Sequence, residues 1–293
     1  HSLYFSYDVL ECVETPIKSL NLNGLNSLIM SNYPSIFNDV IGPVMRGPSS
    51  SHCAASLRIA RICLDLMGGQ IKDILIEFDP NGSLATTHKG QGSDMGLFGG
   101  FLGWDADDER LPESEKHLSK AGINYAIQIT ELANKHPNTY KISLTNDTEY
   151  RELIAISTGG GMIEVIDIDG NRVSMAGDYY ETLIFCVNAD QVMPYIMSTI
   201  PYDDVIYHQG EKSFIEIRSQ QPLAENICGE IQQMLDVQAV KRIRPVLPIM
   251  ARKGLAVPFI TCAEMMTYNE GRNKALWELA VDYESIRGNI GKG

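Results

Sequence analysis

The chain has 293 residues, 44% hydrophobic and 21% charged, a composition typical of a soluble globular protein with one large core or two modest domains. Its net charge of −13 argues against nucleic acid or an anionic membrane surface as the main partner, because both repel an acidic chain. No apolar run approaches the roughly 20 residues that span a bilayer, and no secretory signal is visible at the start, so we expect a cytoplasmic protein.

The first part of the chain begins without a clear pattern and then turns helical. It starts at His1 rather than Met, which we interpret as a processed start or a cloning remnant, and residues 1–33 contain Asn-rich turns. A helix is predicted after residue 51, with apolar positions at helical spacing: Leu57, Ala60, Leu64 and Met67. Its polar residues lie on the other side: Arg58, Arg61 and Asp65. Gly68-Gly69 ends this helix.

Strands dominate the segment that follows. Apolar alternation between turn residues predicts strands at 74–78, 83–87, 123–129, 141–144 and 152–168. A short helix with an acidic first turn is predicted at 112–120. The last strand pattern is interrupted by Gly159-Gly160-Gly161, which costs stability unless backbone or ligand must approach closely there.

Residues 180–245 show the order of a second unit, βαββαβ, which is a ferredoxin-like arrangement. Its predicted strands are 182–187, 204–208, 213–218 and 239–244, and its predicted helices are 190–199 and 222–235. A linker follows that contains Pro245, Pro248 and Arg252-Lys253-Gly254. Two helices are predicted beyond it, at 261–268 and 274–287, and they have so little core of their own that they should dock on this chain or on a partner.

The cysteines are widely scattered, and no two of them form a CxxC pair: Cys12, Cys53, Cys63, Cys186, Cys228 and Cys262. Dispersed cysteines in a cytosolic chain predict reduced, mostly buried thiols. Because sequence-local ligand pairs are missing, we do not expect a complete metal or cluster site built from this chain alone.

The most informative stretch is Gly47-Pro48-Ser49-Ser50-Ser51-His52. Gly and Pro fix a turn, and the serines can cap the helix that follows. Hydroxyl groups and free backbone N–H groups at a helix start can dock a carboxylate, and His52 can carry a proton near neutral pH. The simpler interpretation is an N-cap serine in a small-residue turn, but the crowding of three serines and a histidine between proline and helix favours a site.

Two further segments contain candidate site residues. Thr86-Thr87-His88-Lys89-Gly90-Gln91-Gly92-Ser93-Asp94 joins a possible base, a cation and an expected N-cap pair at Ser93-Asp94, although alone it fits a flexible polar loop equally well. Ser157-Thr158-Gly159-Gly160-Gly161 is a strand bulge or an empty nest in its simpler interpretation, and it lacks the ending of a P-loop. A Ser/His hydrolase is not favoured, because no G-x-S-x-G elbow is present.

Taken together and in order, these motifs resemble the β subunit of bacterial iron–sulfur-dependent L-serine dehydratase. The matching run begins at Val40 and ends with the triple glycine, and it includes Asp108-Glu109-Arg110 and His136-Pro137-Asn138-Thr139. The resemblance implies an α+β fold with a serine-dehydratase β-type domain at 34–178, an ACT-like domain at 179–246, and a linker at 247–293 with helices like those that open the family's α subunit. Residues 1–33 stay an unassigned extension.

The resemblance also implies a reaction, the conversion of L-serine to pyruvate and ammonia. In the family a [4Fe–4S] cluster with one open iron acts on the substrate hydroxyl, and a base removes the α-proton. The cluster-binding cysteines belong to the α subunit, so this chain would grip the amino acid without holding metal. Carried over to this sequence, substrate binding falls to Ser49, Ser50, Ser51, Gly90, Asp94 and Gly160, and orienting or proton-transfer roles to His52, His88 and Lys89.

The chain departs from the family pattern at three places. Cys53 stands where Thr is usual, and Gln91 stands where the loop usually has His. Gln cannot titrate, so if that His is the family's base, this chain lacks the base or uses His88 instead. The ACT-like unit lacks a Gly-rich turn at 188–191, which favours packing or dimerisation there. Two alternatives stay open: a non-catalytic amino-acid-binding or regulatory homologue, and a lyase for another β-substituted amino acid. We expect a homodimer or a hetero-oligomer with an α part.

Overall fold

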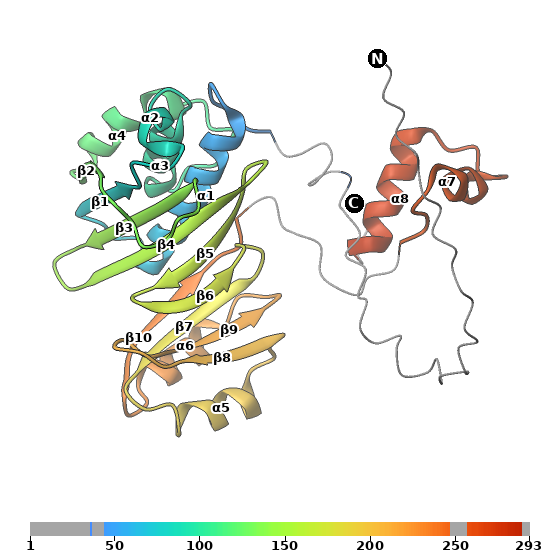
Figure 1. The fold of residues 1–293 in the computed structure, drawn as a ribbon. Helices are drawn as coiled ribbons and strands as arrows, with labels where there is room; N and C mark the ends of the chain where they lie inside the picture. Colours follow the sequence, from blue (N-terminus) through green and yellow to red (C-terminus); the bar gives the residue numbers. More distant parts are fainter. Residues whose placement is uncertain (1–35, 37–43, 247–256, 289–293) are drawn as a thin grey trace, which may run out of the picture.

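The computed structural model describes residues 36, 44–246 and 257–288, and within them the protein is a mixed α+β fold with two sheets (Figure 1). The predicted α+β class is therefore confirmed. Predictions for residues 1–33 and for the linker at 247–256 lie outside the described residues. Within the described part of the chain, no helix is long and apolar enough to cross a membrane.

The first sheet contains six strands in the order β2-β1-β3-β4-β5-β6. Their bounds are β1 Asp73–Phe78, β2 Asn124–Ile129, β3 Thr139–Thr145, β4 Tyr150–Gly159, β5 Met162–Ile168 and β6 Asn171–Met175. Only β1 and β2 run parallel, and the other neighbours are antiparallel. The associated helices are α1 Ser50–Leu66, α2 Leu84–Thr87, α3 Ser93–Phe101 and α4 Ser114–Lys120, with a 3₁₀ turn η2 at Leu111–Glu113.

The predicted strand at 83–87 is wrong, because these residues form the short helix α2. Leu84 is buried in the core of the first sheet, and the Thr87 hydroxyl donates a hydrogen bond to the Ser83 carbonyl at 2.6 Å, one helical turn earlier. The Ser83 N–H donates to Pro137 O at 2.8 Å rather than to a neighbouring strand. A segment of four or five residues is too short for its apolar spacing to separate a strand from a helical turn.

Helix α1 is buried on more than one side, since it packs against α3 as well as against β4, β5 and β10. The expectation that Arg58 lies on a separate polar face is therefore wrong: Arg58 is only 1% exposed. Its guanidinium donates hydrogen bonds to the carbonyls of Gly161 (2.9 Å), Val246 (3.1 Å) and Ala176 (3.3 Å). Burial lowers the pKa of Arg58 to about 10 while the nearby Asp178 opposes the shift, so the side chain stays charged at neutral pH.

The second sheet has the βαββαβ order predicted from the sequence. Its strands are β7 Tyr180–Cys186, β8 Asp204–His208, β9 Phe214–Ser219 and β10 Val237–Ile243, and its helices are α5 Val192–Thr199 and α6 Glu225–Gln232. The strands pair in the order β10-β7-β9-β8, all antiparallel. The ACT-like identity of this unit stays a prediction.

The two sheets share a core. Leu183, Phe185 and Phe214 of the second sheet belong to the same buried cluster as the strands of the first sheet. Polar contacts cross the same interface: the Arg151 guanidinium lies 3.7 Å from the centre of the Phe185 ring, and Arg218 Nη2 donates to the carbonyl of Ser174 at 2.7 Å. The chain passes between the sheets in the segment 176–179, next to the predicted domain boundary, and the division into domains itself stays a prediction.

The predicted C-terminal helices are present as α7 Cys262–Asn269 and α8 Leu276–Gly288. Thr261 and Glu264 form a capping box at the start of α7. A small apolar cluster joins the two helices through Phe259, Leu279 and Tyr283, and Ile36 packs against it. The Ile36 N–H also donates to Glu284 at 2.5 Å. The helix pair thus contacts Ile36 of this chain, while docking on a partner stays a prediction.

Arg58→Met keeps a long unbranched side chain but removes the donors to three backbone carbonyls, two of them in buried contacts. We expect this variant to lose about 3–5 kcal/mol of unfolding free energy, because a buried acceptor without a donor pays its full desolvation cost. Urea denaturation checks this. As a control, Lys72→Met breaks the exposed ion pair with Asp147 and should have no measurable effect. Equal losses in both variants would contradict the structural role of Arg58.

Candidate functional site

The strand order brings the sequence motifs to one edge of the first sheet. Because β3 is antiparallel to both β1 and β4, the end of β1, the start of β3 and the end of β4 lie at the same edge. The 88–94 loop follows β1 through α2, residues 136–139 open β3, and the triple glycine ends β4. The first turn of α1 joins this edge, since a Cβ placed on Gly161 would lie 3.3 Å from Cβ of Ala54.

The segment Gly47–His52, called the serine turn from here on, is open at the surface. Ser50 is exposed, and Ser49, Ser51 and His52 are partly buried, so the three hydroxyl groups are not enclosed in packed interior. Ser49 occupies the N-cap position of α1, but its side chain makes no capping bond. Instead its Oγ lies 2.8 Å from Nδ1 of His52 and 3.5 Å from Oγ of Ser51. A serine therefore occupies the N-cap position, as the sequence allowed, but its hydroxyl does not cap, and the first turn keeps its N–H groups free of a side-chain cap from Ser49.

The 88–94 loop contains a second histidine whose Nδ1 contacts a polar side chain. His88 Nδ1 lies 2.7 Å from Oδ1 of Asp94, and the His88 ring packs against the ring of Phe78. Burial raises the pKa of Asp94, and the neighbouring His88 opposes the rise. The predicted N-cap pair is wrong, because Gly92 caps α3 with a φ of +84°, while Ser93 is buried beside Tyr140.

Backbone contacts hold the 88–94 loop against the serine turn. The Ser49 N–H donates to the Gln91 carbonyl at 3.3 Å. A Cβ on Gly92 would come within 2.9 Å of Pro48 Cδ, so the close approach and the positive φ both require glycine there. Lys89 and Gly90 are exposed at the tip of this loop.

The triple glycine forms the turn between β4 and β5, with φ values of +105°, +62° and +84°. Gly159 and Gly160 are exposed, whereas Gly161 is buried against α1 and its carbonyl accepts from Arg58. The Ser157 N–H donates to Asn138 O at 3.0 Å, which ties the 136–139 turn to the same edge.

The structure thus brings together the backbone around Ser49–His52, the 88–94 loop and the triple glycine, while the roles of these residues stay predictions. Sequence reasoning missed Arg58 as the residue that joins α1 to the glycine turn. The available signal was the apolar character on both sides of α1, where Ile59, Ile62 and Cys63 flank the positions that predicted one apolar face.

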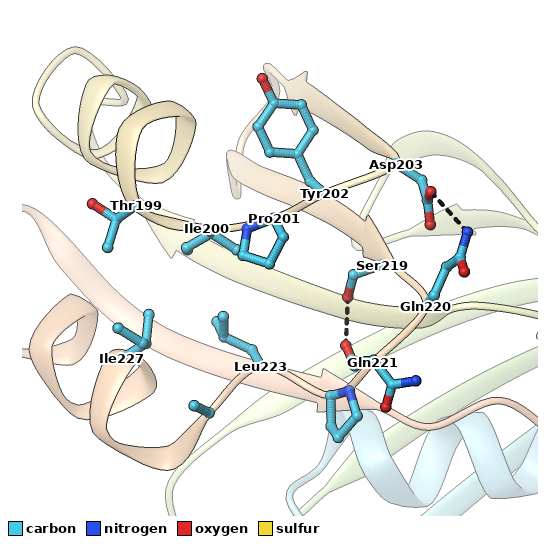
Figure 2. Close-up of a pocket in the computed structure, with 12 residues that line it drawn as sticks. Thr199, Ile200, Pro201, Tyr202, Asp203, Ser219, Gln220, Gln221, Leu223 and Ile227 are labelled. Carbon is cyan, nitrogen blue, oxygen red and sulfur yellow. Dashed lines mark hydrogen bonds between the residues drawn. The ribbon is translucent and has the colours of Figure 1, made fainter.

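Two hollows are relevant to the search for a binding site. One of about 340 Å³ lies beside the serine turn and is lined by residues including Met45, Ala54 and Arg58 rather than by the serines. Another, of about 360 Å³, lies in the second unit between the end of α5 and the start of α6 (Figure 2). There Gln220 donates to Asp203 at 3.1 Å and Ser219 to the Gln221 carbonyl at 2.8 Å, so part of its polar rim is already satisfied within the protein.

The described residues do not fit an iron–sulfur cluster. No group of three His, Cys, Asp or Glu side chains in the described ranges could hold a metal ion. The five cysteines in these ranges are free, and Cys53, Cys63 and Cys186 are buried. Burial raises the pKa of Cys53 to about 11 and raises that of Cys63 as well, so neither is a ready thiolate ligand.

Comparison with known proteins gives two relatives. No family model matches the chain. The chain is 31% identical over 219 residues to a Bacillus subtilis (strain 168) protein named "Probable L-serine dehydratase, beta chain", an alignment covering 72% of this chain and 98% of the relative. It is 35% identical over 175 residues to the "L-serine dehydratase, beta chain" of Peptoniphilus asaccharolyticus, covering 58% of this chain and 76% of that protein.

The glycine turn allows a matched test of packing against α1. Gly160→Ala adds a methyl group at positive φ with nothing within 4 Å, so it should cost only the backbone strain of about 1–2 kcal/mol. Gly161→Ala adds the same strain but also places Cβ 3.2 Å from Met45 Sδ and 3.3 Å from Ala54 Cβ. We expect it to be less stable than Gly160→Ala by about 1 kcal/mol or more in urea denaturation. Equal stability would mean that the turn does not press on α1.

Proposed function

The chain belongs to the family of L-serine dehydratase beta chains, and on this premise we propose that it is the substrate-binding part of a lyase that converts L-serine to pyruvate and ammonia. The observation that supports this most directly is the exposed serine turn. The hydroxyl group of Ser49 lies beside the His52 ring. The backbone of the same turn contacts the loop that carries His88 and Lys89.

In this proposal the serine turn binds the substrate carboxylate. Ser50 and Ser51 are available as hydroxyl donors, and the start of α1 adds N–H groups that no side chain caps. Ser49 Oγ makes a hydrogen bond with Nδ1 of His52, so it orients the imidazole and is less available to the substrate. Gly90 and Gly160 are exposed and contribute backbone to the rim of the same surface.

The candidates for moving the α-proton of the substrate are His52, His88 and Lys89. Both imidazoles have Nδ1 occupied, by Ser49 Oγ and by Asp94 Oδ1 respectively, which leaves Nε2 of each ring for a proton. The Asp94 carboxylate holds the His88 ring through Nδ1, an arrangement that suits a positioned general base. Asp94, expected to bind substrate, is engaged with His88, so we assign it to orienting that ring. Lys89 is exposed and suits attraction of the carboxylate.

A second polypeptide completes the site in this proposal. The described residues offer no ligands for a cluster, so the [4Fe–4S] group that the family uses would be brought by an α part, and no step at a metal is assigned to this chain. The open surface around the serine turn suits such a partner, since Val44 at its margin is 77% exposed. The second unit would be an ACT-like domain with a packing or dimerising role.

A second candidate function is binding without catalysis. Gln91 occupies the loop position where the family has a histidine, and it contributes its backbone carbonyl to Ser49, a contact that any residue could make. If no other residue supplies the base, the chain would bind an amino acid and regulate a partner instead of acting on it.

The test of the proposed function is co-expression of the chain with a cluster-bearing α partner, followed by measurement of pyruvate formation from L-serine. Ser51→Ala should raise KM about ten- to a hundredfold, because a hydrogen bond to a charged group is worth roughly 1.5–3 kcal/mol. Ser119→Ala is the control, since its hydroxyl only donates to the Glu115 carbonyl on α4, and it should leave KM unchanged.

Two results would contradict this assignment. Calorimetric binding of L-serine to the complex without release of pyruvate would support the non-catalytic candidate. Pyruvate release with an unchanged KM in Ser51→Ala would keep the lyase but place its carboxylate grip elsewhere.

A further inference from the structure

Two glutamates are buried between the sheets, remote in sequence from the candidate site. Glu181 on β7 is 1% exposed and Glu216 on β9 is fully buried. In the strand register Glu181 faces Arg218 and Leu183 faces Glu216, so the two carboxyl groups are diagonal neighbours on one side of the sheet. That side faces the first sheet, because Leu183 and Phe214 on it belong to the shared core.

Glu216 has a full set of donors. Nε2 of His208 lies 2.6 Å from one carboxylate oxygen. Arg218 approaches the other oxygen with Nε at 2.7 Å and Nη2 at 2.6 Å. Burial opposes ionisation, but these contacts outweigh it and lower the pKa of Glu216.

Glu181 is in the opposite situation. Within the described part of the chain its Oε2 has no hydrogen-bond partner, and Nε of Arg218, 3.6 Å away, already donates to Glu216. Burial first, and then the negative charge of Glu216 and a hydrogen bond to it, raise the pKa of Glu181 well above its usual range. Asp178, in the connection before β7, adds a further negative charge.

Other cations lie near Glu181 but are paired elsewhere. On and just after β10, which pairs with β7, Lys241, Arg242 and Arg244 line a hollow together with Glu181 and form ion pairs with Glu149, Glu225 and Asp65 respectively.

On β8, Asp204 lies 3.9 Å from Arg218 and competes for the same cation, while His208 is directed to Glu216. On β6 the facing group is the carbonyl of Ser174, which accepts from Arg218 at 2.7 Å. Two carboxyl groups that share a hydrogen bond in a buried site need one proton between them.

We propose that Glu181 keeps its proton at neutral pH and donates it to Glu216, so that this pair, the carboxyl latch, makes the contact between the two sheets depend on pH. When Glu181 loses the proton, two carboxylates compete for Arg218. The Arg218 guanidinium then moves toward Glu181 and away from Ser174. The hydrogen bond from Arg218 on β9 to the Ser174 carbonyl on β6 weakens as a result. The latch needs neither substrate nor partner, so it stands independently of the proposed function.

The direction of the pH effect follows from proton binding. A carboxyl whose pKa is raised by folding binds more protons in the folded state, so stability is greatest below the unfolded pKa and falls as pH rises toward the folded pKa. For one proton the unfolding constant rises by up to about tenfold for each pH unit in that window.

Urea unfolding of the full chain between pH 5 and pH 9 tests the latch with two variants. Glu181→Gln keeps the shape of the protonated acid, so we expect it to remove this component of the pH dependence and to be relatively more stable than the wild type as pH rises. Asp204→Asn removes a carboxylate from the same Arg218 without touching the pair, so it should keep the wild-type dependence. An unchanged pH dependence in Glu181→Gln would overturn the proposal.

Infrared spectroscopy gives a second readout, in which the wild type alone can contradict the proposal. At pH 7 the wild type should show the C=O stretch of a buried protonated carboxylic acid, which Asp204→Asn keeps and Glu181→Gln loses. Absence of that band from the wild type at pH 7 would show that both carboxyl groups are ionised, and the latch would not exist.

Discussion

The buried guanidinium of Arg58 is the constraint on which the arrangement of this protein depends. Because the guanidinium is enclosed, it has to donate its hydrogen bonds within the protein. Three separate segments supply the acceptor carbonyls: Gly161 in the glycine turn, Ala176 after β6, and Val246 after the second sheet. Each of these segments is therefore held to the same point on α1. The serine turn begins that same helix, so its position relative to the glycine turn is fixed by a residue inside the core.

In the candidate site, backbone hydrogen bonds join the segments, and side chains supply the groups that titrate. Backbone groups set the distances: Ser49 N–H on the Gln91 carbonyl, and Ser157 N–H on the Asn138 carbonyl. In the proposed reaction the proton transfer is assigned to side chains such as His52 and His88, each of which has Nδ1 engaged by a neighbouring side chain. The contact at position 91 uses the backbone carbonyl of Gln91, so this part of the arrangement does not depend on which side chain stands there.

Much of the fold could be predicted from the sequence, since long alternating segments and turn residues fixed most strands and the βαββαβ order of the second unit. The errors have physical causes. The segment 83–87 was too short to show a period, and its helical form depends on Leu84 entering the core and on the distant Pro137 carbonyl. Arginine usually lies at the surface, so the sequence predicted an exposed Arg58. Its burial depends on three carbonyls that are remote in sequence. Motif order predicted that the serine turn and the 88–94 loop meet, but not that Ser49 bonds His52 or that Asp94 bonds His88, because such pairings depend on side-chain rotamers.

The contact between Ile36 and Glu284 limits how far the C-terminal helices can stray from the serine turn. Ile36 precedes Val44 by eight residues (44 − 36), and a fully extended chain of that length spans at most about 29 Å. While the contact holds, the part of α8 at Glu284 therefore cannot lie much farther than that from Val44. For a partner bound to α8, such tethering corresponds to an effective concentration at the serine turn on the order of millimolar. Even a partner with weak affinity for the serine turn would therefore contact it repeatedly before dissociating from α8.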